Sequence, residues 1–259
     1  MKVAAVIPVF NNAATLPRVI AALRAQQADE LLVVDDASTD DSAKVARREG
    51  ARVIALGANA GRGAARARAC AESSAPLILM CDATLELPVD FLAQARPWFE
   101  EERVAAVFGH VRQPTPRGVA DRWRGRHLFK PQPSGPPNRQ AMLGTGASLL
   151  RVAAVAAVGG FDPALRSGED ADLGRRLLAD RWQVVADPRL HAACIRHDSA
   201  HAVLARYARW NSPGGLGAHA FLRQCAYALK SMAVADLHAH DPLAAMLSLA
   251  SPFYQLWRR

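Results

Sequence analysis

Cysteine is scarce in this chain and has no paired spacing. The four cysteines, Cys70, Cys81, Cys194 and Cys225, are scattered over 259 residues. Disulfide-held secreted domains and zinc sites both need cysteines at short, repeated spacings. The pattern therefore excludes a disulfide framework and a cysteine-based zinc site, and we expect reduced cysteines in a cytoplasmic protein.

Long hydrophobic runs are also missing. Although 51% of the residues are hydrophobic, no uninterrupted apolar run reaches the length of a transmembrane helix. The N-terminus leads directly into a strand-like segment, without the basic start and apolar stretch of a signal peptide. We expect a soluble or at most peripheral protein, located in the cytoplasm or at the inner face of the membrane.

Lysine is rare, so arginine carries most of the positive charge. Only Lys2, Lys44, Lys130 and Lys230 occur, while the net charge is +8. Such a charge favours nucleic acid, anionic membrane or phosphorylated ligands as partners, and arginine suits bidentate phosphate binding. An arginine-rich composition on solvated faces explains the same charge without any partner. No recognisable nucleic-acid-reading element accompanies the arginines, so we expect no nucleic-acid partner.

Short apolar runs alternate with helical patterns along the chain. The strand-like segments are residues 2–9, 31–35, 52–56, 77–81 and 103–111, and the helical ones are 15–27, 41–50 and 63–73. This alternation predicts a parallel sheet covered by helices on both faces, with ligands beyond the carboxyl ends of the strands. The polar side chains expected at that edge are Asn11, Asp35, Asp36, Asn59 and Asp82.

The C-terminal part of the chain is mostly helical. We predict a catalytic domain over residues 1–205 and a helical extension over 206–259 that packs on the same domain. The apolar segment 242–259 has two interpretations, a helix packed on the core or a helix lying in a membrane interface.

An acidic pair opens one of the helical patterns. Glu169 and Asp170 follow Gly168, and Leu173 and Leu177 continue with helical spacing. The helix dipole and the free N–H groups of a helix N-terminus favour ionised carboxylates, and an ionised carboxylate in a cleft can act as a general base. Capping of the helix alone explains the same pair.

The glycine run at residues 57–63 has several interpretations. A dinucleotide-binding fingerprint would follow the first strand, whereas this run follows the third. A short-chain dehydrogenase needs a tyrosine and a lysine four positions apart, but Tyr227 and Lys230 are three apart. There remains a helix N-terminus with Arg62 and Arg66, a combination that can hold a pyrophosphate.

Five blocks occur in one order along the chain. They are Pro8 to Asn12, Val33 to Asp40, Asn59 to Arg66, Cys81 to Pro88 and Ser167 to Leu173. In this order the chain resembles the family 2 glycosyltransferases over residues 1–200. The resemblance implies an α/β, three-layer nucleotide-diphospho-sugar transferase fold (GT-A, Rossmann-like), with a mostly parallel sheet and a helical C-terminal tail. It also implies inverting transfer of a sugar from a nucleotide-diphosphate donor to a glycan, lipid-linked or peptide acceptor.

The resemblance assigns roles to individual residues. Asp170 deprotonates the acceptor hydroxyl and Glu169 positions the acceptor. Asp36 contacts the base or ribose of the donor, and Arg66 is the arginine of its helix that touches the donor. The full set of implied donor-binding residues is Pro8, Phe10, Asn11, Asp36, Asn59, Gly61, Arg66 and Asp82.

One position departs from the family pattern where a metal is expected. Asp82 is the first acid of the family's Asp-x-Asp motif, but Thr84 stands in place of the second, and a hard cation prefers carboxylates. Three alternatives follow: Mg²⁺ or Mn²⁺ held by Asp82, His197 and the phosphates; a metal-independent site in which arginine supplies the charge; or a catalytically degenerate nucleotide- or glycan-binding protein. A sugar-phosphate nucleotidyltransferase would need a Gly- and Arg-rich loop where Pro8 to Asn12 stand.

Overall fold

The computed structural model describes residues 1–129, 134–211 and 217–257. The chain divides into two compact units. Unit 1 comprises Met1–Arg112 and Gln132–Ile195, and unit 2 comprises Gln113–Pro131 and Arg196–Arg259.

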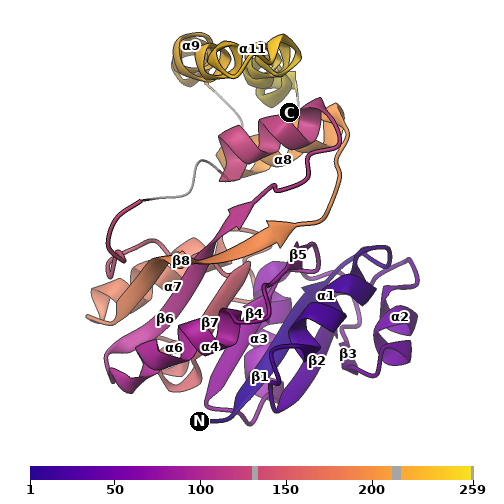
Figure 1. Ribbon diagram of the computed structural model, residues 1–259, viewed down its shortest axis with the longest axis vertical. Coiled ribbons are helices and arrows are strands. Elements are labelled where there is room, and N and C mark those ends of the chain that lie inside the picture. Colours follow the sequence, from indigo (N-terminus) through magenta and orange to yellow (C-terminus); the bar gives the residue numbers. More distant parts are fainter. Residues whose placement is uncertain (130–133, 212–216, 258–259) are drawn as a thin grey trace. The chain divides into compact units, whose positions relative to one another are not determined.

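Unit 1 is built on one mixed sheet (Figure 1). Its strands are β1 (Val3–Val9), β2 (Glu30–Asp35), β3 (Arg52–Ala55), β4 (Leu77–Cys81), β5 (Leu85–Glu86), β6 (Val104–Arg112), β7 (Ala147–Arg151) and β8 (Gln183–Cys194), in the order β3-β2-β1-β4-β7-β6-β8-β5. The first four strands pair in parallel. Parallel neighbours need a crossover connection, and a helix lies between each consecutive two of these four strands along the chain.

The sheet becomes mixed on the far side of β4. β7 runs antiparallel to both β4 and β6, whereas β8 runs parallel to β6 and antiparallel to β5. The alternating pattern of the first strands predicted only parallel pairing. The α/β class with a mostly parallel sheet, which the resemblance implies, is confirmed by these pairings.

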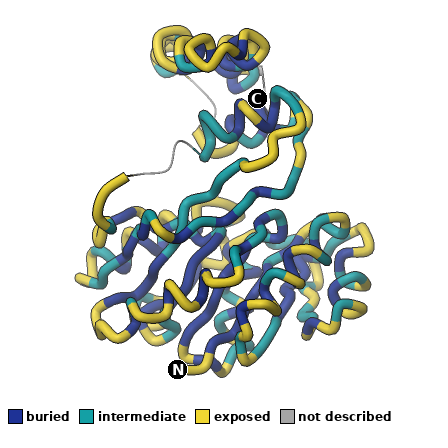
Figure 2. The backbone as a smooth tube through the Cα atoms, viewed as in Figure 1, coloured by how far each residue is buried: buried dark blue, intermediate teal, exposed yellow. Residues whose placement is uncertain are grey.

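Helices cover both faces of this sheet (Figure 1). Those of unit 1 are α1 (Leu16–Arg24), α2 (Ser42–Arg48), α3 (Arg62–Glu72), α4 (Phe91–Ala95), η1 (Arg96–Glu100), α6 (Val152–Ala157) and α7 (Glu169–Ala179). Ala4 and Val6 of β1 share one buried cluster with residues of α3 and α7. Because side chains alternate along a strand, Ala5 and Ile7 point to the other face, where the apolar stripe of α1 is buried. Figure 2 shows the resulting core as buried stretches along the strands.

Unit 2 is helical. It consists of α5 (Val119–Arg124), η2 (Gly125–Phe129), α8 (Ala200–Asn211), α9 (Ala218–Tyr227), η3 (Ala228–Ala233), α10 (Val234–His238) and α11 (Pro242–Trp257). Its core gathers Trp123 of α5, Tyr207 of α8 and Met232 of η3, and the Trp123 and Tyr207 rings meet edge to face at 5.3 Å. The segment 242–259 is therefore helical up to Trp257, and residues 258 and 259 lie outside the described residues.

Within the described part of the chain, none of the helices combines the length and the apolar character needed to cross a bilayer.

Candidate active site

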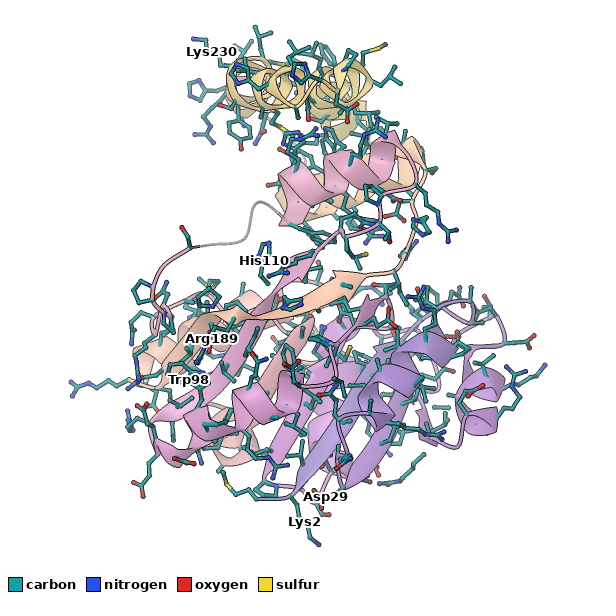
Figure 3. The ribbon with its side chains drawn as sticks, in the orientation of Figure 1. Lys2, Asp29, Trp98, His110, Arg189 and Lys230 are labelled. Atoms are coloured by element: carbon teal, nitrogen blue, oxygen red, sulfur yellow. The ribbon has the colours of Figure 1, made fainter. Side chains whose placement is uncertain are left out.

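The predicted polar residues lie at one edge of the unit 1 sheet. Asp36 directly follows β2 and Asp82 directly follows β4, so both stand at carboxyl ends of parallel strands. The opposite edge, where β1 begins, is marked by Lys2 and Asp29 in Figure 3. There the Asp29 carboxylate accepts the N–H of Val3 at 2.8 Å. The edge with Asp36 and Asp82 is the one at which open α/β sheets bind ligands.

The Asp36 carboxylate organises the loop before α3. It accepts the N–H groups of Ala60 and Gly61 at 2.7 and 2.8 Å, and the amide of Asn59 at 2.9 Å. Asp36 itself is buried. The negative charge of this carboxylate is thus balanced by three N–H donors that point at it. The same bonds fix the loop before the arginine-bearing helix α3 next to the end of β2.

Asn11 holds the loop after β1 against the loop after β2. Its side chain accepts the N–H of Thr39 at 2.8 Å, and its own N–H donates to the Ser38 hydroxyl at 3.0 Å. Asn11 has a φ of 51°, a left-handed conformation that asparagine tolerates better than most residues. The neighbouring Phe10 is exposed, while Pro8 remains within β1 and pairs with Val34.

Arg66 joins two predicted acids. Its guanidinium donates to Asp82 Oδ1 at 2.7 Å and also to Glu169 Oε1. The side chains of Arg66 and Glu169 are each 2% exposed, whereas that of Asp82 is 34% exposed. The structure therefore brings together three residues that the sequence placed in separate blocks, with Asp82 as the member that reaches solvent.

Glu169 and Asp170 open α7, as the sequence predicted for this acidic pair. Gly168 precedes the helix with a φ of 80°, which lets the chain turn into it. Burial raises the pKa of the Glu169 carboxyl, although the nearby Arg66 cation lowers it, and the charge of Asp170 raises it further. Asp170 is half-buried beside it, and its carboxylate accepts the N–H of Ala171 at 2.9 Å.

The site contains buried polar atoms that make no hydrogen bond. Among the described residues these include Arg66 Nε and Glu169 Oε2. Such atoms carry a desolvation cost of about 1–3 kcal/mol each. Two of them at the centre of this cluster mean that the Arg66–Glu169 pair is not optimised for stability alone.

Two glycines let the start of α3 approach the loop before α7. A Cβ on Gly63 would lie 2.2 Å from the carbonyl oxygen of Asp162, and a Cβ on Gly61 would lie 2.7 Å from the Cα of Arg166. Arg166 also donates to the carbonyl of Asn59 at 2.7 Å. Sequence reasoning missed Arg166; its place shortly before the acidic pair was the only signal for it.

The position of the missing second acid lies beside Asp82. Thr84 is half-buried, and its carbonyl oxygen accepts the N–H of Ile195 at 3.0 Å. Gly146 lies close to Asp82, since a Cβ there would stand 3.3 Å from Asp82 Oδ2. Unit 1 therefore offers one carboxylate and one hydroxyl at the place where the resemblance expects two carboxylates.

His197 belongs to unit 2, where it contacts a buried acid. Its Nδ1 lies 2.5 Å from Asp121 Oδ2. Asp121 is buried, which raises its pKa, but hydrogen bonds from His197 and from two backbone N–H groups, together with the Arg124 cation, bring that pKa below its ordinary value. A carboxylate on one imidazole nitrogen orients the ring and leaves Nε2 for another partner, as in many metal-binding histidines.

The described residues contain no group of three or more His, Cys, Asp or Glu side chains that could hold a metal ion. The donor set is consistent with this finding: one oxygen of Asp82 is committed to Arg66, and Thr84 is neutral. A hard cation takes about six oxygen ligands, so at Asp82 most of them would have to come from water and a bound diphosphate. The prediction that Asp82 and His197 bind one metal joins residues of different units and stays a prediction.

Sequence comparison decides the family. The sequence model described as glycosyl transferase family 2 matches residues 4–157, which include Asp36, Arg66 and Asp82. The chain belongs to glycosyl transferase family 2. The match ends before Glu169 and Asp170, so these two acids rest on their own geometry.

Two curated relatives extend the family match. The chain is 32% identical to the succinoglycan biosynthesis protein ExoU of Rhizobium meliloti (strain 1021), over 75% of this chain and 62% of that protein. It is 33% identical to undecaprenyl-phosphate 4-deoxy-4-formamido-L-arabinose transferase of Pseudomonas aeruginosa, over 48% of this chain and 39% of that protein. The chain thus spans less than two thirds of the length of each.

A solved structure shares the fold. The mannosyltransferase PcManGT from Pyrobaculum calidifontis, in complex with GDP-Man and Mn²⁺, has a TM-score of 0.61 and 18% identity to this chain. The similarity covers 96% of this chain and 73% of that one. At this identity the likeness establishes the GT-A fold of the family 2 chain.

Proposed function

We propose that this family 2 chain is an inverting glycosyltransferase that moves a sugar from a nucleoside-diphosphate donor to a hydroxyl group of an acceptor. The observation that carries the proposal is the bridge from Asp82 through Arg66 to Glu169, beside Asp170. It connects the carboxyl edge of the sheet, where nucleotides bind in such folds, to the helix N-terminus that carries the half-buried Asp170.

In the proposed reaction Asp170 takes the proton of the acceptor hydroxyl. The acceptor oxygen forms a bond to the anomeric carbon from the face opposite the diphosphate, and the nucleoside diphosphate leaves with the electron pair of the broken C–O bond. A single displacement of this kind inverts the anomeric centre. A positioned general base contributes about 10²–10⁴-fold to such a rate.

The donor is proposed to lie against the loops after β1, β2 and β3. Asp36 keeps the loop of Asn59 and Gly61 in place beside the end of β2, so that base or ribose meets this region. Asp82 then faces the diphosphate, and the buried Arg66 lies behind it. Pro8, Phe10 and Asn11 complete the proposed donor-binding set from the end of β1.

The charge of the leaving diphosphate has two candidate partners. We propose a divalent cation, Mg²⁺ or Mn²⁺, bound through Asp82 and the donor phosphates, because Asp82 is the solvent-reaching acid of the cluster and the mannosyltransferase neighbour is a complex with Mn²⁺. Bound there, the cation would neutralise developing charge. The replacement of the second acid by Thr84 favours the alternative, in which arginine alone supplies that charge. Donor titrations with Mn²⁺ and with a chelator separate the two.

We propose a lipid-linked acceptor and a cytoplasmic site of reaction. The support for the acceptor class is the curated relative whose name contains undecaprenyl-phosphate. The support for the compartment is that the four cysteines, all among the described residues, form no disulfide, which is typical of reduced, cytoplasmic proteins. Free glycans and peptides are the other acceptor classes to be tested.

A donor panel tests the proposal. The full chain is incubated with nucleoside-diphosphate sugars and a polyprenyl-phosphate or glycan acceptor, and the product is examined by NMR. A product whose anomeric configuration is opposite to that of the donor supports the proposal. Nucleotide binding without any transfer or donor hydrolysis would support the second candidate, a catalytically degenerate binding protein, which the departure at Thr84 favours.

A further inference from the structure

The last helix of unit 2 carries a row of large apolar side chains on its outer side. Leu243, Met246, Leu249, Phe253 and Leu256 are all exposed, and they recur every three or four residues along α11. This spacing places them on one face of the helix. We call these five residues the α11 outer face. In a helix that contacts only water on that side, charged and polar residues are expected there.

The opposite side of α11 packs on the unit through small and polar residues, together with the half-buried Leu247 and Tyr254. Ser248, Ser251 and Gln255 are buried. The Ser248 hydroxyl accepts the indole N–H of Trp123 at 2.9 Å and donates to the buried carboxylate of Asp236. Turning the helix to bury its apolar residues would break these bonds and expose the core around Trp123. The orientation of α11 is therefore fixed by buried hydrogen bonds.

Exposed apolar side chains are concentrated in this helical region. The neighbouring α9, η3 and α10 add Leu222, Leu229 and Leu237, and Figure 2 shows exposed positions along these helices. Within the described residues of unit 1, the large apolar side chains that are exposed are Met1, Phe10, Val89 and Met142. Single exposed residues need no explanation, whereas a concentration of them marks an interaction surface.

The solvent-exposed charged side chains of this region are all positive. Over residues 217–257 the acids are Asp236 and Asp241; both are buried, and they pair with Arg126 and Arg122. The exposed charged residues there are Arg223 and Lys230, and Lys230 projects away from the helices in Figure 3. An apolar face with cations and no exposed carboxylate complements an anionic lipid surface.

We propose that the α11 outer face, together with Arg223 and Lys230, docks on an anionic lipid bilayer. The apolar side chains enter the boundary between headgroups and acyl chains, while the two cations contact lipid phosphates. The polar side of the helix stays in the unit, so α11 lies along the surface with one side in lipid.

A second copy of the chain is the competing occupant of this face. In a symmetric dimer the same patch meets itself, so the cations of each copy would face a patch that offers further cations and no exposed carboxylate. Like charges brought together oppose such an interface, whereas anionic headgroups attract them. The charge pattern therefore favours lipid.

All residues of the docking surface lie in unit 2, away from the candidate active-site residues of unit 1 in the chain. Only the use of this surface to reach a lipid-linked acceptor rests on the proposed function. With this surface, both interpretations of segment 242–259 hold: one side of the helix packs on the unit, and the other side is presented to the membrane.

Flotation of the full chain with vesicles tests the proposal. Vesicles of phosphatidylcholine mixed with phosphatidylglycerol are compared with vesicles of phosphatidylcholine alone. The test variant is Leu243→Glu with Met246→Glu, at side chains that are 59% and 66% exposed. The matched control is Val89→Glu, which is 71% exposed in unit 1. A second variant, Arg223→Glu with Lys230→Glu, leaves α11 untouched.

We expect the wild-type chain and the Val89 variant to float with the anionic vesicles. The Leu243 and Met246 variant should partition at least about tenfold more weakly, since two apolar side chains no longer enter lipid. The Arg223 and Lys230 variant should lose most of the preference for anionic vesicles, by about fivefold or more per charge. All variants should keep the wild-type melting temperature and nucleotide binding, so failure of the surface is distinct from failure of the proposed function.

The proposal is overturned if the wild-type chain does not float, or if the Leu243 and Met246 variant floats as well as the wild type. It is also overturned if light scattering shows a dimer that this variant abolishes, because the face then belongs to a second copy.

Discussion

Arg66 and Glu169 form an ion pair in which both side chains are 2% exposed, although 103 positions separate them in the chain. The pair joins α3, which follows the loop of Asn59 and Gly61, to α7, whose second residue is the proposed base Asp170. A buried ion pair adds little net stability, but loss of one partner leaves an uncompensated buried charge. Separation of α3 from α7 would leave both charges without a partner, so the pair ties the two helices together.

The first prediction concerns this pair and stability. Arg66→Met should lower the free energy of unfolding by about 3–5 kcal/mol, because Glu169 would remain buried without its cation. Arg68→Met on the same helix removes a solvent-exposed pair with Glu72 and should change the stability by less than about 1 kcal/mol. Urea denaturation of both variants measures the difference. Similar effects of the two substitutions would show that the buried pair has no special role.

The second prediction concerns pH. Burial raises the pKa of Glu169 in the folded chain above its ordinary value, so the folded state binds this proton more tightly than the unfolded state does. This difference in proton binding adds to the free energy of unfolding. The contribution is present in full below about pH 4.3, the ordinary pKa of glutamate, and is lost as the pH rises through the pKa of Glu169 in the folded chain. Glu169→Gln removes this contribution.

Denaturation of the wild type and of Glu169→Gln over a pH series measures it. The free energy of unfolding of the wild type relative to that of the variant should fall as the pH rises from about 4.3. Comparison of the two chains cancels the other carboxyl groups, such as Asp121, whose pKa is lowered. A relative stability that increases with pH would mean that the Arg66 charge outweighs burial.

The third prediction concerns the general base. Asp170→Asn should reduce sugar transfer by about 10²–10⁴-fold while leaving donor affinity nearly unchanged, because the amide cannot take the acceptor proton. Asp180→Asn, at the exposed C-terminal end of the same helix, is the matched control and should transfer at the wild-type rate. Transfer assays and donor titrations are made in parallel. If Asp170→Asn loses nucleotide affinity, Asp170 belongs to the donor site and the assigned roles are wrong.

The fourth prediction concerns the contact between the start of α3 and the loop before α7. A methyl group on Gly63 meets the backbone of Asp162, which cannot move aside as a flexible side chain would. Gly63→Ala should lower the free energy of unfolding by about 1–3 kcal/mol and weaken donor binding. Gly57→Ala, where a Cβ meets no atom within 4 Å, should leave both unchanged. Equal behaviour of the two variants in thermal melts and titrations would refute the close approach.

The first four strands were predicted within one or two residues, because short β-branched runs ending in polar turns are a local signal. The predicted helix start at Glu169 was also correct, since Gly168 and the acidic pair are adjacent in sequence. The antiparallel direction of β7 was not predicted from pattern. It depends on pairing between Leu79 and Leu149, a contact that no local spacing encodes.

The same limit applies within the site. The sequence pattern and the family resemblance named Arg66, Asp82 and Glu169 separately, but their connection through one guanidinium arises only when β4, α3 and α7 are packed together. In α11 the periodicity of Leu243, Met246 and Leu249 shows two faces. Which face points inward is decided by the hydrogen bonds of Ser248 with Trp123 and Asp236, which join residues far apart in sequence.

Calorimetric titration of the full chain with UDP, GDP and dTDP, each with Mn²⁺ and with EDTA, tests the central claim most directly. The account predicts saturable binding of one of the three, with a Kd on the order of micromolar, stronger with Mn²⁺ and weakened by Asp36→Asn. Equal binding in EDTA would assign the diphosphate charge to arginine instead of a cation. Absence of binding to all three nucleotides in both conditions would contradict the account of a nucleotide-sugar site at this edge of the sheet.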